Sequence, residues 1–214
     1  FNIHNDLVGY DINLAHKLAR DLGVEIEFVP YTRGQLAEQL RDDHFDVVMS
    51  GVVGTMELAQ QIMHTRPYLD VTLAFVVEDH RVRSFGDMSS LRNMPGLRIG
   101  FVDLSEGLIQ RLQAALPEAR FIKLPSNRHF FQGAHKELDA FLTGAETGSA
   151  FTLFYPEFEV VVPEEQRVSV PLFYAVGNRD EEMRNLLEHW MGLRQKDGNE
   201  KQLYDYWILV QQQE

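Results

Sequence analysis

The chain has 214 residues, of which 44% are hydrophobic and 24% charged, and it carries a formal net charge of -12. It can bury a core, but an acidic chain without a cluster of Lys and Arg lacks the charge that nucleic-acid binding requires. The absence of cysteine excludes disulfides, cysteine-based zinc sites and thiol nucleophiles. Its apolar runs, such as residues 73–77, are far shorter than the roughly 20 residues of a membrane-spanning helix.

The first part of the chain alternates between helical and strand patterns. Apolar spacing predicts a helix over 11–23, with Asp11 as its N-cap and Gly23 at its end. Alternation of apolar residues with glutamates predicts a strand over 24–31. A short helix over 34–43 and a mostly apolar strand over 45–51 follow, which gives a β-α-β unit. A long strand is predicted over 69–79.

A second α/β series starts at residue 97. Its strands are expected over 97–103, 119–125, 138–145 and 158–163, with helices over 105–116, 127–136 and 146–155 between them. A strand over 168–178 and two helices that divide near Asp197 and Gly198 complete the chain.

Two such series predict two α/β lobes with short connections. The long strands over 69–79 and 168–178 are the natural places for the chain to leave lobe 1 and return. We therefore expect lobe 1 at 1–76 and 173–214, and lobe 2, as an insertion, at 77–172. In open α/β sheets, small ligands bind at the carboxyl ends of the strands.

Several segments resemble the family 3 periplasmic solute-binding proteins, which bind polar amino acids and related small acids between two lobes. The resemblance is carried by LVGYD at 7–11, FDVVMSG at 45–51, RPYLD at 66–70 and LRIGFVDLSEG at 97–107. It implies the type 2 periplasmic-binding fold, in which each lobe is a mixed sheet flanked by helices and two strands form the hinge. The family's usual first strand would precede Phe1, so the first strand of lobe 1 is expected to be missing here.

The resemblance also shows where this sequence departs from amino-acid binders. In those proteins the pattern SGxTxTxxR follows the strand, and its Thr and Arg bind the ligand's carboxylate. Val53 and Leu58 occupy the first Thr position and the Arg position here. In lobe 2, Gly144 stands where the family often has an ammonium-binding Asp, and Leu104-Ser105 where it has a Gly-Thr anion loop. Both halves of amino-acid recognition have therefore been altered.

The candidate ligand-binding residues lie at expected strand ends and helix starts, where backbone groups and polar side chains can reach a ligand. They are Tyr10, Ser50, Gly51, Val52, Thr55, Arg66 and Tyr68 in lobe 1, and Asp103, Ser105 and Glu146 in lobe 2. Structural alternatives stay open: an ion pair for Arg66, helix capping for Ser105 and Glu106, and a favourable helix-start charge for Glu146. The scattered histidines show no metal-ligand spacing, and no motif indicates a cofactor.

The resemblance implies a non-catalytic domain at the periplasmic or extracytoplasmic face of a membrane. It would close on a small organic solute, an amino acid-like molecule or an organic acid, and serve a membrane transporter or sensor, either in the same polypeptide or in a separate one. Residues 144–163 further resemble solute-binding domains fused to cation:dicarboxylate symporter-like proteins. Two alternatives stay open: an enzyme similar to prephenate or arogenate dehydratases, with Glu146 or Glu106 as general acid, and a degenerate sensor domain that binds no solute.

Overall fold

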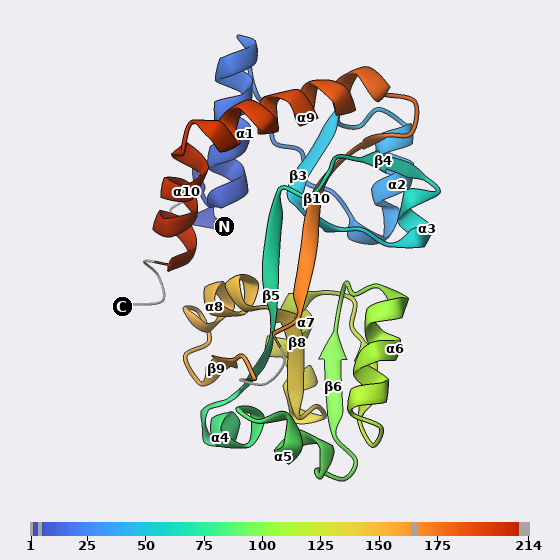
Figure 1. The fold of residues 1–214 in the computed structure, drawn as a ribbon, viewed down its shortest axis with the longest axis vertical. Coiled ribbons are helices and arrows are strands. Elements are labelled where there is room, and N and C mark those ends of the chain that lie inside the picture. The colour runs from blue at the N-terminus through green and yellow to red at the C-terminus, as the bar shows by residue number, and fades with distance from the viewer. Residues whose placement is uncertain (1, 4–5, 164–166, 210–214) are drawn as a thin grey trace. The chain divides into compact units, whose positions relative to one another are not determined.

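The computed structural model describes residues 2–3, 6–163 and 167–209, and the chain forms two compact units (Figure 1). Unit 1 comprises Phe1–Leu69 and Pro171–Glu214, and unit 2 comprises Asp70–Val170. The chain therefore leaves unit 1 after Leu69 and returns to it at Pro171. Unit 2 is an insertion within unit 1.

Unit 1 is built around strand β10 (Ser169–Gly177), which pairs antiparallel with β3 (Val47–Val53) on one side and β4 (Ile62–His64) on the other. A short hairpin, β1 (Asn2–Ile3) and β2 (Asp6–Leu7), precedes the first helix. The helical elements of unit 1 are α1 (Tyr10–Leu22), η1 (Arg33–Gln35), α2 (Leu36–Arg41), α3 (Met56–Ala59), α9 (Glu181–Lys196), α10 (Asn199–Tyr204) and the π-helical turn η4 (Asp205–Leu209).

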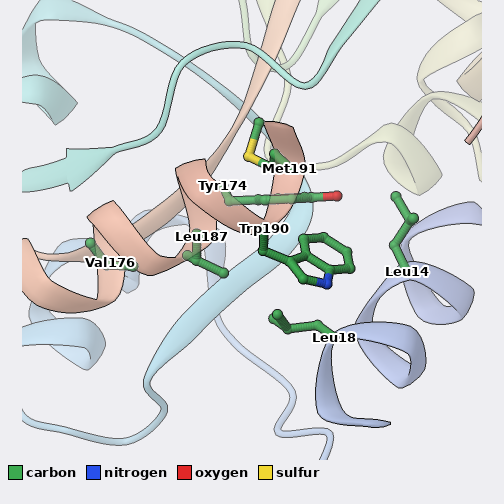
Figure 2. Packing of buried hydrophobic residues seen from close by; sticks show 7 residues of the cluster. All are labelled: Leu14, Leu18, Tyr174, Val176, Leu187, Trp190 and Met191. Atoms are coloured by element: carbon green, nitrogen blue, oxygen red, sulfur yellow. The ribbon is translucent and has the colours of Figure 1, made fainter. Parts of the chain in front are cut away.

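The two faces of this sheet carry different helices, because successive side chains of a strand point to opposite faces. Tyr174 and Val176 of β10 pack with residues of α1 and α9, as Figure 2 shows. Ala175, between them, packs with Val48 and with Leu36 of α2. Thus α1 and α9 cover one face and α2 covers the other. The cluster on the first face consists of Leu14, Leu18, Tyr174, Val176, Leu187, Trp190 and Met191.

Helix α1 begins one residue earlier than the sequence predicted. Gly9, with φ 139°, is its N-cap, and the helix ends at Gly23 in the left-handed conformation, whose N–H donates to the carbonyls of Ala19 and Arg20. The prediction of Asp11 as N-cap was wrong, since Asp11 lies within the first turn. Glycine makes this possible because it adopts positive φ without steric cost.

The predicted strand over 24–31 was also wrong. This segment has no strand assignment and leaves Val24 58% and Val29 40% exposed. It links α1 on one face of the sheet to α2 on the other, so it must pass around the edge of the sheet. Alternating sequence favours an extended backbone, but a strand forms only where a neighbouring strand offers hydrogen-bond partners.

Unit 2 is a mixed sheet flanked by helices. Its strands are β5 (Leu69–Glu78), β6 (Arg98–Phe101), β7 (Arg120–Lys123), β8 (Ala140–Gly144) and β9 (Phe158–Val161). Strand β6 runs parallel to β7 and β8, whereas β5 is antiparallel to β8 and β9. The helical elements are η2 (Asp79–Arg81), α4 (Val82–Phe85), α5 (Met88–Arg92), α6 (Glu106–Ala115), α7 (Asn127–Phe131), η3 (Ala134–Lys136) and α8 (Ala145–Thr152). The prediction of an α/β fold with mixed sheets is confirmed.

Candidate functional site

Strand β3 contains a bulge at Ser50 and Gly51, near its middle. The strand does not end at residue 51, as the sequence predicted, but pairs with β10 as far as Val53. Val52 pairs with Phe173 and Val48 pairs with Ala175, so four residue steps along β3 lie opposite two along β10. Gly51 has φ +66°, a backbone conformation that residues other than glycine rarely adopt. The bulge carries these residues out of the regular ladder, and bulges are common beside functional sites.

Side chains around this bulge have distinct roles. The exposed Ser50 hydroxyl donates to the Tyr31 hydroxyl at 3.2 Å, a contact that sequence reasoning missed. The Val52 side chain is buried in the core, so only its backbone could reach a ligand. Thr55 caps α3, its hydroxyl accepting from the Leu58 N–H at 3.2 Å. Leu58, at the position of the family arginine, packs against the core cluster that contains Val52.

Arg66 lies against helix α9. Its backbone N–H donates to the Glu188 carboxylate at 3.0 Å, and its guanidinium donates to the Glu188 carbonyl at 3.3 Å. These contacts tie the segment between β4 and β5 to α9 and provide a structural role for Arg66. Its part in ligand binding stays a prediction.

Tyr68 and the first turn of α1 are brought together within unit 1. The Tyr68 hydroxyl donates to Asp11 Oδ1 at 2.8 Å, and the Tyr68 ring stacks on Tyr174 with centroids 4.1 Å apart. Burial raises the pKa of Asp11 to about 6, although the hydrogen bond from Tyr68 opposes that shift. Burial and the nearby Asp11 charge raise the pKa of Tyr68 well above its usual value. Tyr10, beside Asp11, packs edge-on against Tyr204 of α10.

The sequence predicted Asp11 only as a helix cap. Its position beside the core could have been predicted, because Asp11 precedes the buried Leu14 and Ala15 by three and four residues and so lies on the same face of the helix. A carboxylate on the apolar face of a helix needs a polar partner. Here that partner is Tyr68, from a segment 57 residues away.

The three candidates of unit 2 gather at one edge of its sheet. Strands β6 and β8 are parallel neighbours, with Phe101 opposite Leu142, so their carboxyl ends lie at the same edge. Asp103 and Ser105 follow β6, and Glu146 follows β8 in the first turn of α8. Ser105 is the N-cap of α6, its hydroxyl accepting from the Leu108 N–H at 3.3 Å. The predicted capping role of Ser105 is therefore confirmed.

Position 144 leaves little room for a larger side chain. A Cβ atom added to Gly144 would lie 3.1 Å from Val71 Cγ2 and 3.5 Å from Glu146 Oε2. The Glu146 carboxylate thus lies beside the position where the family pattern places its ammonium-binding Asp. A carboxylate is present at this place, and it comes from the helix instead of the strand end.

Two kinds of feature are absent from the part of the chain that the structure describes. Among those residues, no three His, Asp or Glu side chains gather as a metal ion would require. None of the helices described there is both long and apolar enough to span a membrane.

Two α/β units joined by two strand segments, with polar groups at strand-to-helix junctions in each unit, define a solute-binding protein of the periplasmic type. The profile of the bacterial extracellular solute-binding proteins, family 3, matches residues 1–210, and the chain belongs to this family. The resemblance to this family seen in the sequence is confirmed, whereas the further resemblance of residues 144–163 to symporter-fused domains stays a prediction.

Individual relatives include both binding proteins and an enzyme. The cyclohexadienyl dehydratase of Pseudomonas aeruginosa is 24% identical over 94% of this chain and 74% of its own length. The ABC transporter arginine-binding protein 1 of Escherichia coli is 22% identical over 96% of this chain and 83% of its own. The ancestral amino acid-binding protein AncCDT-1, described as a precursor of cyclohexadienyl dehydratase, is 27% identical with a TM-score of 0.78, covering 97% of this chain and 89% of its own.

Proposed function

We propose that this chain binds an amino acid, or a small acid or amine related to one, on the extracytoplasmic side of a membrane for a transporter or sensor. The observation that carries the proposal is the Glu146 carboxylate beside Gly144, at the sheet edge that also bears Asp103 and Ser105. Family membership and the arginine-binding and amino acid-binding relatives support it. An acidic edge suits a ligand with an ammonium or guanidinium group.

The ligand's carboxylate would be held without the arginine of the family pattern. With Leu58 packed on the core, the candidates in unit 1 are the backbone groups around Ser50 and Gly51 and the hydroxyl of Thr55. The only proton of the Tyr68 hydroxyl is donated to Asp11, so Tyr68 cannot donate to the ligand's carboxylate in this arrangement. Neutral donors can still form hydrogen bonds to a carboxylate, but they supply neither the positive charge nor the bidentate geometry of an arginine. We therefore expect affinity to depend more on the cationic end of the ligand than on its carboxylate.

A thermal-shift panel tests the proposal directly. The ligands are arginine, lysine, glutamine, glutamate, succinate and putrescine, each at rising concentration with the wild-type chain. A ligand that binds only the folded state stabilises it by about 2.7 kcal/mol at a hundredfold excess over Kd. Stabilisation by arginine, lysine or putrescine but not by succinate supports the proposal. Failure of the whole panel contradicts it and favours a degenerate sensor domain.

Glu146→Gln is expected to weaken binding of a cationic ligand at least tenfold, because one partner of a charge-assisted pair is lost. Titration calorimetry with arginine measures the change. The matched control is Glu181→Gln, which removes an exposed glutamate from the first turn of α9. Equal affinity of the wild-type and Glu146→Gln proteins would contradict a contact between Glu146 and the ligand. Glu146 would then serve only as a favourable charge at the start of α8.

A second candidate function is favoured by the dehydratase relative. Glu146, half-buried at a strand-to-helix junction, could donate a proton to a leaving hydroxyl. Incubation with prephenate or arogenate, followed by mass spectrometry, decides between the two functions. Loss of either compound with the wild-type protein, but not with Glu146→Gln, would establish an enzyme. Recovery of both unchanged is expected for a binding protein.

A further inference from the structure

The two segments by which the chain passes between its units are joined to each other inside unit 1. Tyr68 directly precedes the exit at Leu69, and its N–H donates to the Leu172 carbonyl at 3.0 Å, just after the return at Pro171. The Tyr68 ring also stacks on Tyr174, with 21° between the ring planes. The two connecting segments, at Tyr68 and at Leu172–Tyr174, are therefore bound to each other within unit 1.

A second pair of hydrogen bonds reinforces this connection. The Thr65 N–H donates to the Tyr174 carbonyl at 3.0 Å, and the Tyr174 N–H donates to the Thr65 hydroxyl at 3.2 Å. Thr65 is 2% exposed and Tyr174 is 1% exposed. Buried and reciprocal bonds of this kind resist opening more than exposed ones.

The two connecting segments are linked to helix α1 by the hydrogen bond from the Tyr68 hydroxyl to Asp11 at 2.8 Å. Apolar packing of Tyr174 against Leu14 and Leu18 also connects them, but such packing has no preferred direction. A hydrogen bond is directional and sets an angle as well as a distance. Asp11 is adjacent to Tyr10, so the same turn of α1 carries a candidate ligand residue.

Net stabilisation of the fold is not sufficient to explain the Asp11–Tyr68 pair. A partly buried carboxyl that is costly to ionise could be replaced by apolar groups of the same shape with little loss. What an apolar replacement would lose is the directional constraint on Tyr68. The arrangement is therefore better explained by positioning than by stability.

We propose that Asp11 and Tyr68 are a positioning pair that fixes how both connecting segments leave unit 1, and that solute affinity depends on it. The second half of the proposal rests on the proposed function. Affinity falls when fewer molecules occupy the binding-competent arrangement, even if no ligand contact changes. Neither residue needs to touch the solute to have this effect.

Amide hydrogen exchange tests the pair without any ligand. Tyr68→Phe keeps the ring but removes the hydroxyl, and Asp11→Leu removes the acceptor. Both should speed exchange of the Tyr68 and Tyr174 amides roughly tenfold or more, the expected loss of a hydrogen bond to a charged group. Asp11→Asn keeps an Oδ1 acceptor and should stay within about threefold of wild type. If Tyr68→Phe does not fold, the comparison of Asp11→Leu with Asp11→Asn still tests the pair. Equal exchange of the Tyr68 and Tyr174 amides in these two variants would contradict the proposal.

Asp21→Asn is the matched control. Asp21, at the other end of α1, also accepts a hydrogen bond from an aromatic donor, Trp190 Nε1, at 2.8 Å. It is remote in sequence from both connecting segments. Its loss should leave the Tyr68 and Tyr174 amides unchanged. Unchanged exchange in Tyr68→Phe, or an equal increase throughout unit 1 in both Tyr68→Phe and Asp21→Asn, would overturn the proposal.

Calorimetry with L-arginine tests the second half. We expect Tyr68→Phe and Asp11→Leu to raise Kd severalfold, while Asp11→Asn and Asp21→Asn bind as the wild type does. If Tyr68→Phe and Asp11→Leu speed exchange of the Tyr68 and Tyr174 amides but leave Kd unchanged, affinity does not depend on the pair, and the second half of the proposal is wrong. If arginine does not bind the wild-type chain, the proposed function fails for this ligand, and the exchange result alone decides whether the pair positions the segments.

Discussion

Relative to the wild-type chain, the Asp11→Asn variant is expected to gain about 2.5 kcal/mol of stability as the pH rises from 4 to 7. The pKa of Asp11 is raised from 3.8 to about 6 in the folded protein, and each pKa unit corresponds to about 1.36 kcal/mol. A raised pKa means that the folded state binds the proton more tightly than the unfolded state. The wild-type chain therefore has this contribution below pH 3.8 and loses it as the pH rises through 6. Asparagine does not titrate, so the variant escapes that loss.

Urea unfolding of both proteins at pH 4, 5, 6 and 7 measures the difference, in which the effects of other titrating groups cancel. Asp87→Asn is the control, because hydrogen bonds from Ser89 and Ser90 lower the pKa of Asp87 to about 2. That contribution is present above pH 3.8 and is lost only as the pH falls towards 2. Its difference from wild type should be flat between pH 4 and 7. A flat difference for Asp11→Asn as well would contradict the burial of its carboxyl.

Phe141→Ala is expected to destabilise unit 2 by about 3–5 kcal/mol, the usual cost of replacing a fully buried Phe. Phe141 lies on the central strand β8 with no exposed surface. Its ring stacks on Phe130 at 5.1 Å and meets Phe131 edge-on at 6.2 Å. Alanine would leave a cavity among aromatic rings that already pack on one another, so the site can collapse only in part.

Thermal and denaturant unfolding, followed by amide exchange in β8, measures this loss. Phe154→Ala makes the same chemical change at a residue that is 60% exposed, two residues after the end of α8. The control should cost less than about 1 kcal/mol. A similar small loss for Phe141→Ala would mean that the aromatic cluster of unit 2 is not its core. Since β8 leads directly to Glu146, a loosened β8 would also disturb the candidate site.

The candidate site departs from the family pattern at two positions. At Gly144, Val71 and the Glu146 carboxylate lie close to the backbone. At the position of the family arginine, Leu58 packs against the core. We therefore expect the solute to differ from that of typical amino-acid binders more at its carboxylate end than at its cationic end.

Much of the fold followed from local sequence patterns. The amphipathic spacing of 11–23 led to α1, and the long apolar strands 69–79 and 168–178 led to β5 and β10, within a residue or two at each end. Ser105 was expected to cap a helix and does so. These features depend on neighbours in the sequence, since helix periodicity, strand alternation and capping act over a few residues.

The features that the sequence could not determine depend on partners far along the chain. Residues 24–31 have a strand pattern but no strand, because a strand needs a neighbour as well as a propensity. The link from Asp11 to Tyr68, the bulge at Ser50 and Gly51, and the Glu146 carboxylate beside Gly144 appear only in the folded chain. The sequence by itself determined the family, the helix α1 and the long strands β5 and β10. Only the tertiary structure decided which polar groups meet, because burial and hydrogen bonding between distant segments set their positions and their pKa values.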